Sequence, residues 1–278
     1  MGLTRPDGGR DRIGCGRLIL ASNGFGGNRD MVAEHMPEIS GALYFGHPGN
    51  QGEALLWGEA LGAEIRHASA YQGHGNVAHP HGILVTWAVM SEGGCQVNRN
   101  GLRFWNEGQG YWEAAQAVLA QPGGEAIAIF DERIASIARQ FADFCEAETQ
   151  GAVRRFDAIS DLAGGFGLPA EALEQTMAAF EAAKAGAAPD RFGRALTGVA
   201  ALRPPFCGVR VTAALFHTQG GLAVDQRARV RKRTGGVFEN LFAVGGAACG
   251  VSGSGASGYL SGNGLLSAVT LGLIAGRR

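Results

Sequence analysis

Apolar residues near the C-terminus follow two different periods. Residues 237–244 form a short, mostly apolar run, which predicts a buried strand. A stretch rich in glycine and serine follows, from Gly245 to Gly262. Beyond it, apolar residues recur at the spacing of one helical face: Leu265, Leu266, Val269, Leu273 and Ile274. Ser261 or Asn263 can cap this helix and Gly276 can end it, so the segment predicts a strand, a long glycine loop and a helix.

A strand, a glycine loop and a helix N-terminus are typical of sites that bind phosphate or another electron-rich group. The N–H groups of the first helical turn have no acceptor inside the helix, and the helix dipole favours negative charge there. A mobile surface loop is the alternative. The letters G-x-G-x-x-G occur at Gly253, Gly255 and Gly258, but the loop is long on both sides and no acidic residue follows. We therefore interpret the glycines as a group and not as a dinucleotide fingerprint.

The rest of the chain alternates between strand and helix patterns. Residues 3–20 predict a hairpin around a Pro-Asp-Gly turn. Strands are predicted at residues 17–21, 83–90 and 126–130, and helices at residues 53–62, 111–120, 132–144 and 170–183. This alternation predicts an α/β fold.

Composition sets limits on the class of protein. The 278 residues suffice for one large domain or two smaller ones, and 46% are hydrophobic. The formal net charge of −1 gives no support for nucleic acid as a partner. The five cysteines are scattered, with no C-x-x-C, which predicts free thiols and a cytoplasmic location. We expect no membrane association, since no apolar run is long enough to span a bilayer.

Four stretches of the sequence resemble motifs of one flavoprotein family. They are LILASNGFGGN at residues 18–28, VNRNGLRFWNE at 97–107, HTQGG at 217–221 and the segment from LFAVGG to SGNGLLSA at 241–268. Together they are similar to the FAD-dependent oxidoreductases of the fumarate reductase and succinate dehydrogenase flavoprotein type. The resemblance implies an incomplete FAD/NAD(P)-binding, Rossmann-like domain at residues 1–70 and 217–278. An α+β capping domain at residues 71–216 would interrupt it.

The resemblance also implies which residues bind FAD. They lie in the matched motifs: Ala21, Ser22, Asn23, Gly24, Thr218, Gly220, Gly221, Gly245, Gly246, Ser261, Gly262, Asn263 and Leu265. Gly246 stands where the family has a glutamate that binds the ribityl chain. We expect that this difference changes how the cofactor is held.

The implied catalytic residues are His74, His217, Tyr111 and Arg103. The two histidines would orient substrate oxygens, and Tyr111 or Arg103 would relay a proton. Tyr259, a predicted substrate-binding residue, replaces an arginine that clamps a substrate carboxylate in the family. The alternatives are a core histidine at position 217 and a Tyr-Trp pair that packs a helix start at position 111. We expect no metal, because His74, His79 and His81 match no common zinc spacing.

One departure concerns the N-terminus. The family begins with a βαβ unit that carries G-x-G-x-x-G, and residues 1–17 do not form one. We expect that this unit lies on a separate chain or that the reading frame is truncated. The predicted activity is hydride transfer between flavin N5 and a carbon adjacent to a carbonyl or carboxyl group of a small organic substrate. The alternatives are a non-catalytic fragment or partner subunit of a split flavoprotein, and a small-ligand binding module.

Overall fold

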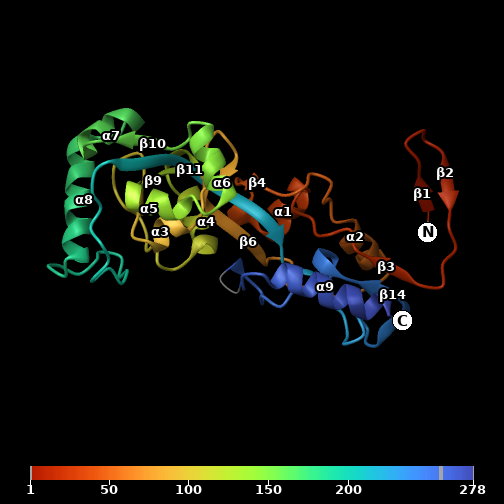
Figure 1. Cartoon of the computed structure of the whole chain (residues 1–278). Coiled ribbons are helices and arrows are strands. Elements are labelled where there is room, and N and C mark those ends of the chain that lie inside the picture. Colours follow the sequence, from red (N-terminus) through yellow and green to blue (C-terminus); the bar gives the residue numbers. More distant parts are fainter. Residues whose placement is uncertain (1, 257–258, 278) are drawn as a thin grey trace. The chain divides into compact units, whose positions relative to one another are not determined.

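The computed structural model describes residues 2–256 and 259–277, and Figure 1 labels their elements. The chain divides into two compact units. The first unit comprises Met1–Met36, His47–Tyr71 and His217–Arg278, and the second comprises Pro37–Gly46 and Gln72–Phe216. Placing residues 37–46 in the first unit was wrong. Strand β4 (Leu43–Tyr44) pairs in parallel with β11 (Phe206–Thr218) of the second unit's sheet, so this short segment belongs there.

The second unit is built on a mixed seven-stranded sheet. Its central strands follow the order β7-β6-β11-β9-β8, and β4 and β10 pair with β11. The remaining strands are β6 (Tyr71–Ala78), β7 (Ile83–Leu84), β8 (Cys95–Val97), β9 (Glu125–Asp131) and β10 (Arg154–Phe156). The helices are η1 (Pro37–Ile39), α3 (Ala88–Ser91), α4 (Tyr111–Leu119), η2 (Pro122–Gly124), α5 (Glu132–Ala138), α6 (Ala142–Thr149), α7 (Ile159–Phe166) and α8 (Ala170–Lys184).

Every residue of β9 is buried, so neither face of this strand meets solvent. Its apolar run matches the strand predicted at residues 126–130. Two other predictions for this unit were wrong. Residues 83–90 do not form one strand, because Thr86 Oγ1 accepts the Ala88 N–H and α3 begins there. Residues 132–144 form two helices instead of one: α5 ends at Ala138, and Phe141 is extended and precedes the start of α6 at Ala142.

The first unit contains three small sheets and a long C-terminal helix. The sheets are β1-β2, β12-β5 and β13-β14-β3, and β3 runs parallel to β14. The strands are β1 (Gly2–Thr4), β2 (Arg10–Arg12), β3 (Leu18–Leu20), β5 (Ile65–Arg66), β12 (Gly221–Leu222), β13 (Arg229–Arg231) and β14 (Val237–Ala243). The helices are α1 (Arg29–His35), α2 (Glu53–Ala60), η3 (Gly245–Ala247) and α9 (Asn263–Gly276). The whole fold is α/β, as the sequence predicts.

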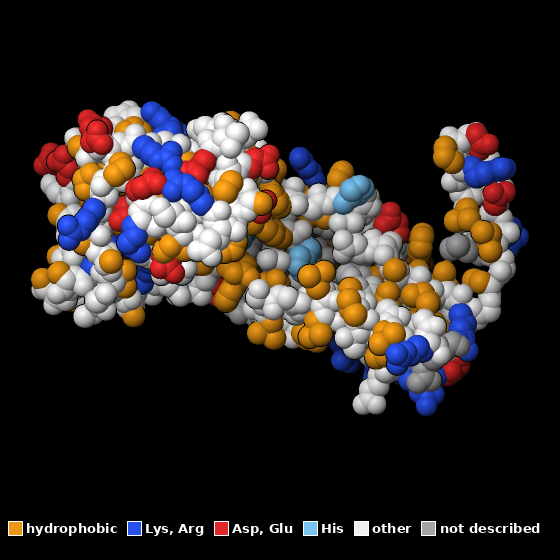
Figure 2. Space-filling model, in the orientation of Figure 1, with side chains coloured by type: hydrophobic (Ala, Val, Ile, Leu, Met, Phe, Trp, Pro, Cys, Tyr) orange, Lys and Arg blue, Asp and Glu red, His pale blue; other side chains and the backbone are white. Residues whose placement is uncertain are grey.

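Helix α9 begins at Asn263 as expected, but neither predicted side-chain cap forms. Gly262 occupies the cap position with φ of 81°, a left-handed conformation that favours glycine. One side of α9 packs through Ala275, while Leu265, Leu266 and Val269 are 79%, 66% and 70% exposed. Figure 2 shows hydrophobic side chains on the surface over this region. Among residues 2–256 and 259–277, no helix has the length and hydropathy needed to cross a membrane.

Candidate functional site

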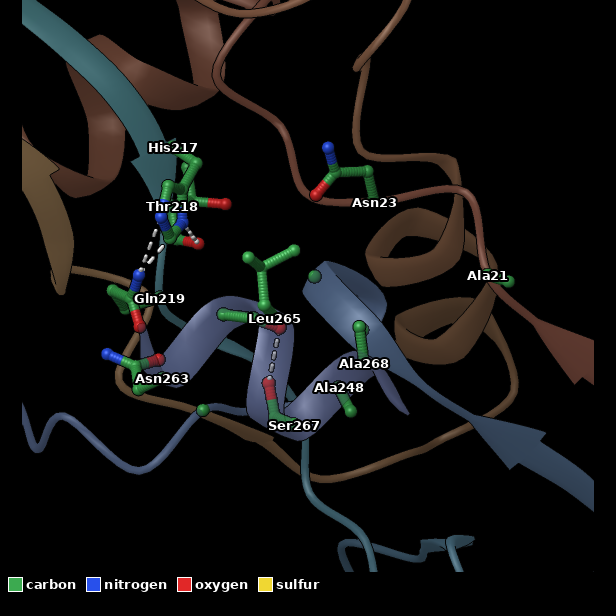
Figure 3. A pocket seen from close by; sticks show the side chains of 14 residues that line it. Ala21, Asn23, His217, Thr218, Gln219, Ala248, Asn263, Leu265, Ser267 and Ala268 are labelled. Carbon is green, nitrogen blue, oxygen red and sulfur yellow. Dashed lines mark hydrogen bonds between the residues drawn. The ribbon is translucent and has the colours of Figure 1, made fainter. Parts of the chain in front are cut away.

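A cavity of about 530 Å³ opens in the first unit (Figure 3). Three segments that are distant in sequence build it: the loop after β3, the end of β11 with the following turn, and the segment from η3 to the first turns of α9. Parallel pairing of β3 with β14 places the carboxyl ends of these two strands side by side. The carboxyl ends of parallel strands are the usual place for a ligand in an α/β sheet.

Two glycines allow these segments to approach one another. A side chain at Gly24 would overlap with Thr218, and a side chain at Gly246 would overlap with the Oδ1 atom of Asn23. Asn23 itself has φ of 65°, a conformation that asparagine tolerates better than most residues. The Asn23 amide therefore lies over Gly246, in the space that a side chain at position 246 would need. A residue with a side chain at position 246 would require the Asn23 amide to move.

Two buried polar atoms at the cavity lack hydrogen-bond partners among the residues that the structure describes. They are Thr218 Oγ1 and Asn263 Oδ1, on residues that are 3% and 4% exposed. Leaving a buried polar atom without a partner costs about 1–3 kcal/mol. Such atoms are expected where a ligand completes the hydrogen bonding.

The N-terminus of α9 also faces this cavity, through Asn263, Gly264, Leu265, Ser267 and Ala268 (Figure 3). The N–H groups of a first helical turn have no acceptors inside the helix, and the dipole makes this end partly positive. Because Gly264 carries no side chain, backbone and ligand can approach closely there. With the Thr218 hydroxyl, which can donate a hydrogen bond, the helix end fits a polar group that carries negative charge, and Asn263 Oδ1 fits an N–H or O–H donor of the same ligand.

A chain of buried side chains runs from α9 to His217. Asn263 Nδ2 lies 2.5 Å from Ser252 Oγ, and Ser252 Oγ lies 3.0 Å from Gln219 Oε1. Gln219 Nε2 lies 2.8 Å from His217 Nδ1. Burial lowers the pKa of His217, so the imidazole is neutral at neutral pH.

Eight predicted site residues line the cavity. One is His217, and the other seven belong to the predicted cofactor-binding set: Ala21, Asn23, Thr218, Gly245, Gly246, Asn263 and Leu265. The other six have different surroundings. Ser22, Ser261 and Gly262 are exposed and do not line it. Gly24, Gly220 and Gly221 allow close packing against Thr218, His67 and Ala248 instead.

The cavity includes six residues that the sequence analysis missed: Gln219, Ala248, Gly250, Gly264, Ser267 and Ala268. Ser267 and Ala268 follow Asn263 and Gly264 by one helical turn, so i, i+4 spacing could have identified them. No sequence signal singles out Gln219, because its role depends on the Ser252 hydroxyl reaching it across the fold.

Tyr259, the predicted substrate-binding residue, is buried in the first unit. Its ring stands edge-on to the His217 imidazole, with centroids 6.1 Å apart. A phenol ring beside His217 cannot supply the bidentate contact that an arginine makes with a carboxylate. Tyr259 is not among the residues that line the cavity.

His74 lies in an aromatic stack inside the second unit. Its ring is parallel to those of Tyr111 and Phe216, with centroids 5.0 and 5.2 Å away, and Trp87 approaches edge-on. Burial lowers the pKa of His74 to about 3, so the ring is neutral at neutral pH. Its Nδ1 atom accepts the Asn76 N–H at 3.1 Å, which leaves the proton on Nε2. His74 is therefore a hydrogen-bond donor.

Arg103 lies in a buried ion cluster of the second unit. Its Nε and Nη2 atoms donate to the two Glu107 oxygens at 3.0 and 2.6 Å, and Nη1 donates to Asp190. Arg194 donates to the same Glu107 at 3.2 Å. The Arg103 guanidinium is therefore engaged by two carboxylates of the second unit.

Comparison with known proteins identifies the family. A model described as "FAD binding domain" matches residues 3–265, so the chain belongs to the family of FAD binding domains. A relative named "Probable fumarate reductase Ifc3", from Shewanella frigidimarina, is 28% identical over 95% of this chain and 44% of its own length. The 3-oxosteroid 1-dehydrogenase of Mycobacterium tuberculosis is 27% identical over 85% of this chain and 48% of its own length.

Solved structures agree on the fold. The open conformation of a flavocytochrome c3 fumarate reductase superposes with a TM-score of 0.79 and 27% identity, over 96% of this chain and 46% of that one. A 3-ketosteroid Δ1-dehydrogenase from Sterolibacterium denitrificans shares the fold, with a TM-score of 0.69 and 23% identity over 100% and 56% of the two chains. The chain thus spans about half the length of these relatives. FAD is the cofactor of the family, and the cavity's orphaned polar atoms fit it.

Proposed function

We propose that the protein acts as an FAD-dependent oxidoreductase and that the cavity of the first unit holds part of the cofactor. The observation that carries this proposal is the pair of buried atoms without protein partners, Thr218 Oγ1 and Asn263 Oδ1. The α9 N-terminus and the glycine-lined backbone beside them support it. When bound, flavin supplies the hydride-transfer chemistry.

The roles of the protein's own residues follow from their surroundings. The first turn of α9 would stabilise negative charge on the bound group. His217 and His74, both neutral, would donate hydrogen bonds to oxygen atoms. Tyr111 remains the proposed proton-relay residue among those of the second unit, and Arg103 would hold that unit's structure through Glu107. These assignments favour Tyr111 as the acid or base.

We further propose that the substrate reacts at a carbon next to a carbonyl group. Tyr259 stands at the position where the resemblance implies an arginine, and its phenol edge faces His217. A hydroxyl and an imidazole can hydrogen-bond a single carbonyl oxygen, whereas a dicarboxylate calls for charged partners. The named relatives include both kinds of substrate: one is a fumarate reductase, named for a carboxylate, and another is a 3-oxosteroid dehydrogenase, named for a carbonyl compound.

The exposed side of α9 favours an addition to this proposal. Leu265, Leu266 and Val269 form an apolar surface, and Ile19 on β3 is 42% exposed. The relatives named above are about twice as long as this chain. We propose that a βαβ segment covers this surface and completes the FAD site. That segment would belong either to the same polypeptide or to a separate chain.

A flavin titration tests these proposals. The chain alone is expected to bind FAD weakly, and a βαβ segment taken from a relative and added in trans should tighten binding. In the completed complex, Thr218→Val should weaken binding by about 5- to 30-fold, because about 1–2 kcal/mol of hydrogen bonding is lost. Thr149→Val, at an exposed threonine of the second unit, is the matched control.

The possible outcomes separate the two proposals. Tight binding to the chain alone would overturn the βαβ proposal and leave the flavin site standing. No binding to the complex, or equal affinity for wild type and Thr218→Val, would overturn the flavin site. In that case the chain would be a non-catalytic partner of a flavoprotein.

A further inference from the structure

A second cavity, of about 320 Å³, lies wholly within the second unit. Its floor is a face of the large sheet, where Ile127 of β9 stands directly opposite Arg210 of β11. Glu125 precedes Ile127 by two residues on β9, so its side chain lies on the same face. Arg99, from the segment after β8, completes a charged side of this cavity. The cavity is therefore separate from the one in which we place flavin.

The charged side of this cavity carries more positive than negative charge. Arg99 Nη2 and Arg210 Nη1 donate to the same Glu125 oxygen, Oε2, at 2.9 and 3.0 Å. His79 Nε2 lies 3.2 Å from the other oxygen. Burial opposes ionisation of Glu125, but the hydrogen bonds from the two arginines outweigh it and lower the carboxyl pKa. One carboxylate thus faces two guanidinium groups, and neither arginine pairs with another acidic side chain in the described part of the chain.

The two arginines keep hydrogen-bond donors for a ligand. Each uses a single nitrogen on Glu125, and their side chains are 51% and 35% exposed, so the other nitrogens are not enclosed by protein. The Arg99 guanidinium lies against Gly123, where any side chain would overlap with Nη2. This contact holds the group at the edge of the cavity. The planar fork of a guanidinium matches the two oxygens of a carboxylate.

The other side of the cavity is apolar. Its side chains are all buried: Ala126, Ile127, Phe166 and Leu168. Helix α7 ends beside them at Gly167, and the carbonyl end of a helix disfavours an anion. Arg154 compensates for this, because its Nη1 donates to the Gly165 carbonyl and its guanidinium carbon lies 5.0 Å from the centre of the Phe166 ring. The cavity therefore combines donors for an anion with an apolar wall.

We propose that this cavity binds a small organic monocarboxylate, with its carboxylate on Arg99 and Arg210 and its apolar body against Ile127 and Phe166. The charge balance favours a single negative charge, since one guanidinium remains uncompensated by Glu125. The apolar wall favours a carboxylate with a hydrocarbon body over inorganic phosphate, which has no apolar surface to bury. A cavity of about 320 Å³ is at the lower end of the range for ligand sites, which suits a small molecule.

Benzoate is the probe, and benzamide, which has a similar shape and no charge, is the matched control. The experiment is NMR of the full chain with ¹³C-labelled isoleucine methyl groups, in which Ile127→Val assigns the Ile127 signal. This signal should move with benzoate and stay in place with benzamide. Arg99→Gln should weaken benzoate binding about 3- to 10-fold, because a charge-assisted hydrogen bond from a half-exposed group is lost. Glu125→Gln should strengthen binding by about 2-fold or more, because a competing carboxylate is removed.

Arg139→Gln removes an arginine that pairs with Glu132 and Glu148 outside the cavity, and it should leave the benzoate affinity unchanged. The opposite signs at Arg99 and Glu125 distinguish a binding site from an ion cluster that only supports the fold. An unmoved Ile127 signal at millimolar benzoate, an equal response to benzamide, or weaker binding in Glu125→Gln would overturn the proposal. If Glu125→Gln fails to fold, the wild-type and Arg99→Gln titrations decide the question. No flavin is needed, so this proposal and the flavin proposal can fail separately.

Discussion

The ion cluster of the second unit and the cavity of the first unit differ in how their buried polar groups are satisfied, although Glu113 Oε2 and Glu181 Oε2 of the second unit also lack hydrogen-bond partners among the described residues. In the second unit, Glu107 receives hydrogen bonds from Arg103 and Arg194, so a fully buried carboxylate is satisfied by the protein itself. In the first unit, Thr218 Oγ1 and Asn263 Oδ1 are equally buried and have no partner among the described residues. The comparison shows that a buried charge inside a motif can be structural, while buried atoms without partners are informative about a ligand where they border a cavity.

The units differ in the same way in their apolar groups. Strand β9 of the second unit is buried along its entire length. Helix α9 of the first unit carries an equally apolar sequence but exposes Leu265, Leu266 and Val269. A large exposed apolar surface usually marks a place where another segment or protein binds. The first unit therefore presents an apolar surface on this side of α9, where our proposal places a covering segment.

The largest effect is expected at the buried ion cluster. Glu107→Gln removes the charge that neutralises Arg103 and Arg194, and breaking a buried ion pair typically costs about 3–5 kcal/mol. The free energy of unfolding, measured with urea, should fall by that amount. Glu132→Gln removes a half-exposed partner of Arg139 and Arg155 and should cost about 1 kcal/mol or less. Equal effects of the two substitutions would contradict the assignment of the cluster as structural.

A smaller loss of stability is expected when the pH is lowered. The folded state holds His74 with a pKa of about 3, below its ordinary value of 6.5, so the unfolded chain binds the extra proton first. Stability is therefore complete above pH 6.5 and declines as the pH falls towards 3. Between pH 7 and pH 5 this one group should cost about 2 kcal/mol.

The control for this pH effect is a variant without the titrating ring. His217, whose pKa burial also lowers, acts in the same direction, and Glu113, whose pKa burial raises, acts in the opposite one. The difference between the pH dependence of the free energy of unfolding of wild type and that of His74→Phe gives the contribution of His74 without those of His217 and Glu113. Urea unfolding at pH 7, 6 and 5 measures it, and His81→Ala at an exposed site should follow the wild type. Parallel curves for wild type and His74→Phe would show that His74 is not buried as neutral imidazole.

Local patterns predicted much of the fold. The apolar run at residues 126–130 became β9, and the period at 170–183 became α8, because a buried strand and an amphipathic helix each leave a distinct spacing. The prediction of one strand at residues 83–90 was wrong, because a short apolar stretch does not distinguish a buried helical turn from a strand. The placement of residues 37–46 depended on pairing with β11, which no local pattern records.

The candidate site was predicted where it follows a motif and missed where it depends on the fold. Asn23, Thr218, Gly246 and Asn263 came from the resemblance and line the cavity. The crowding of Asn23 over Gly246 joins residues that are distant in sequence, and so does the contact of Ser252 with Gln219. Gly253 and Gly255, which belong to the G-x-G-x-x-G letters that we did not interpret as a dinucleotide fingerprint, do not line the cavity, and Gly258 lies outside the described residues.

The smallest effect is expected on the exposed side of α9. Replacing Leu266 and Val269 with lysine removes apolar side chains that already contact solvent, so the free energy of unfolding should change by about 0.5 kcal/mol or less per site. Leu222→Ala, at a fully buried leucine of the same unit, should cost about 2–5 kcal/mol and serves as the contrast.

Self-association, measured by sedimentation, should decrease in the lysine variant because the apolar surface is interrupted. The lysine variant should also lose the gain in FAD affinity that an added βαβ segment gives. A loss of stability comparable to that of Leu222→Ala would mean that this side of α9 is already covered within the chain, and the contrast between the two units would then disappear.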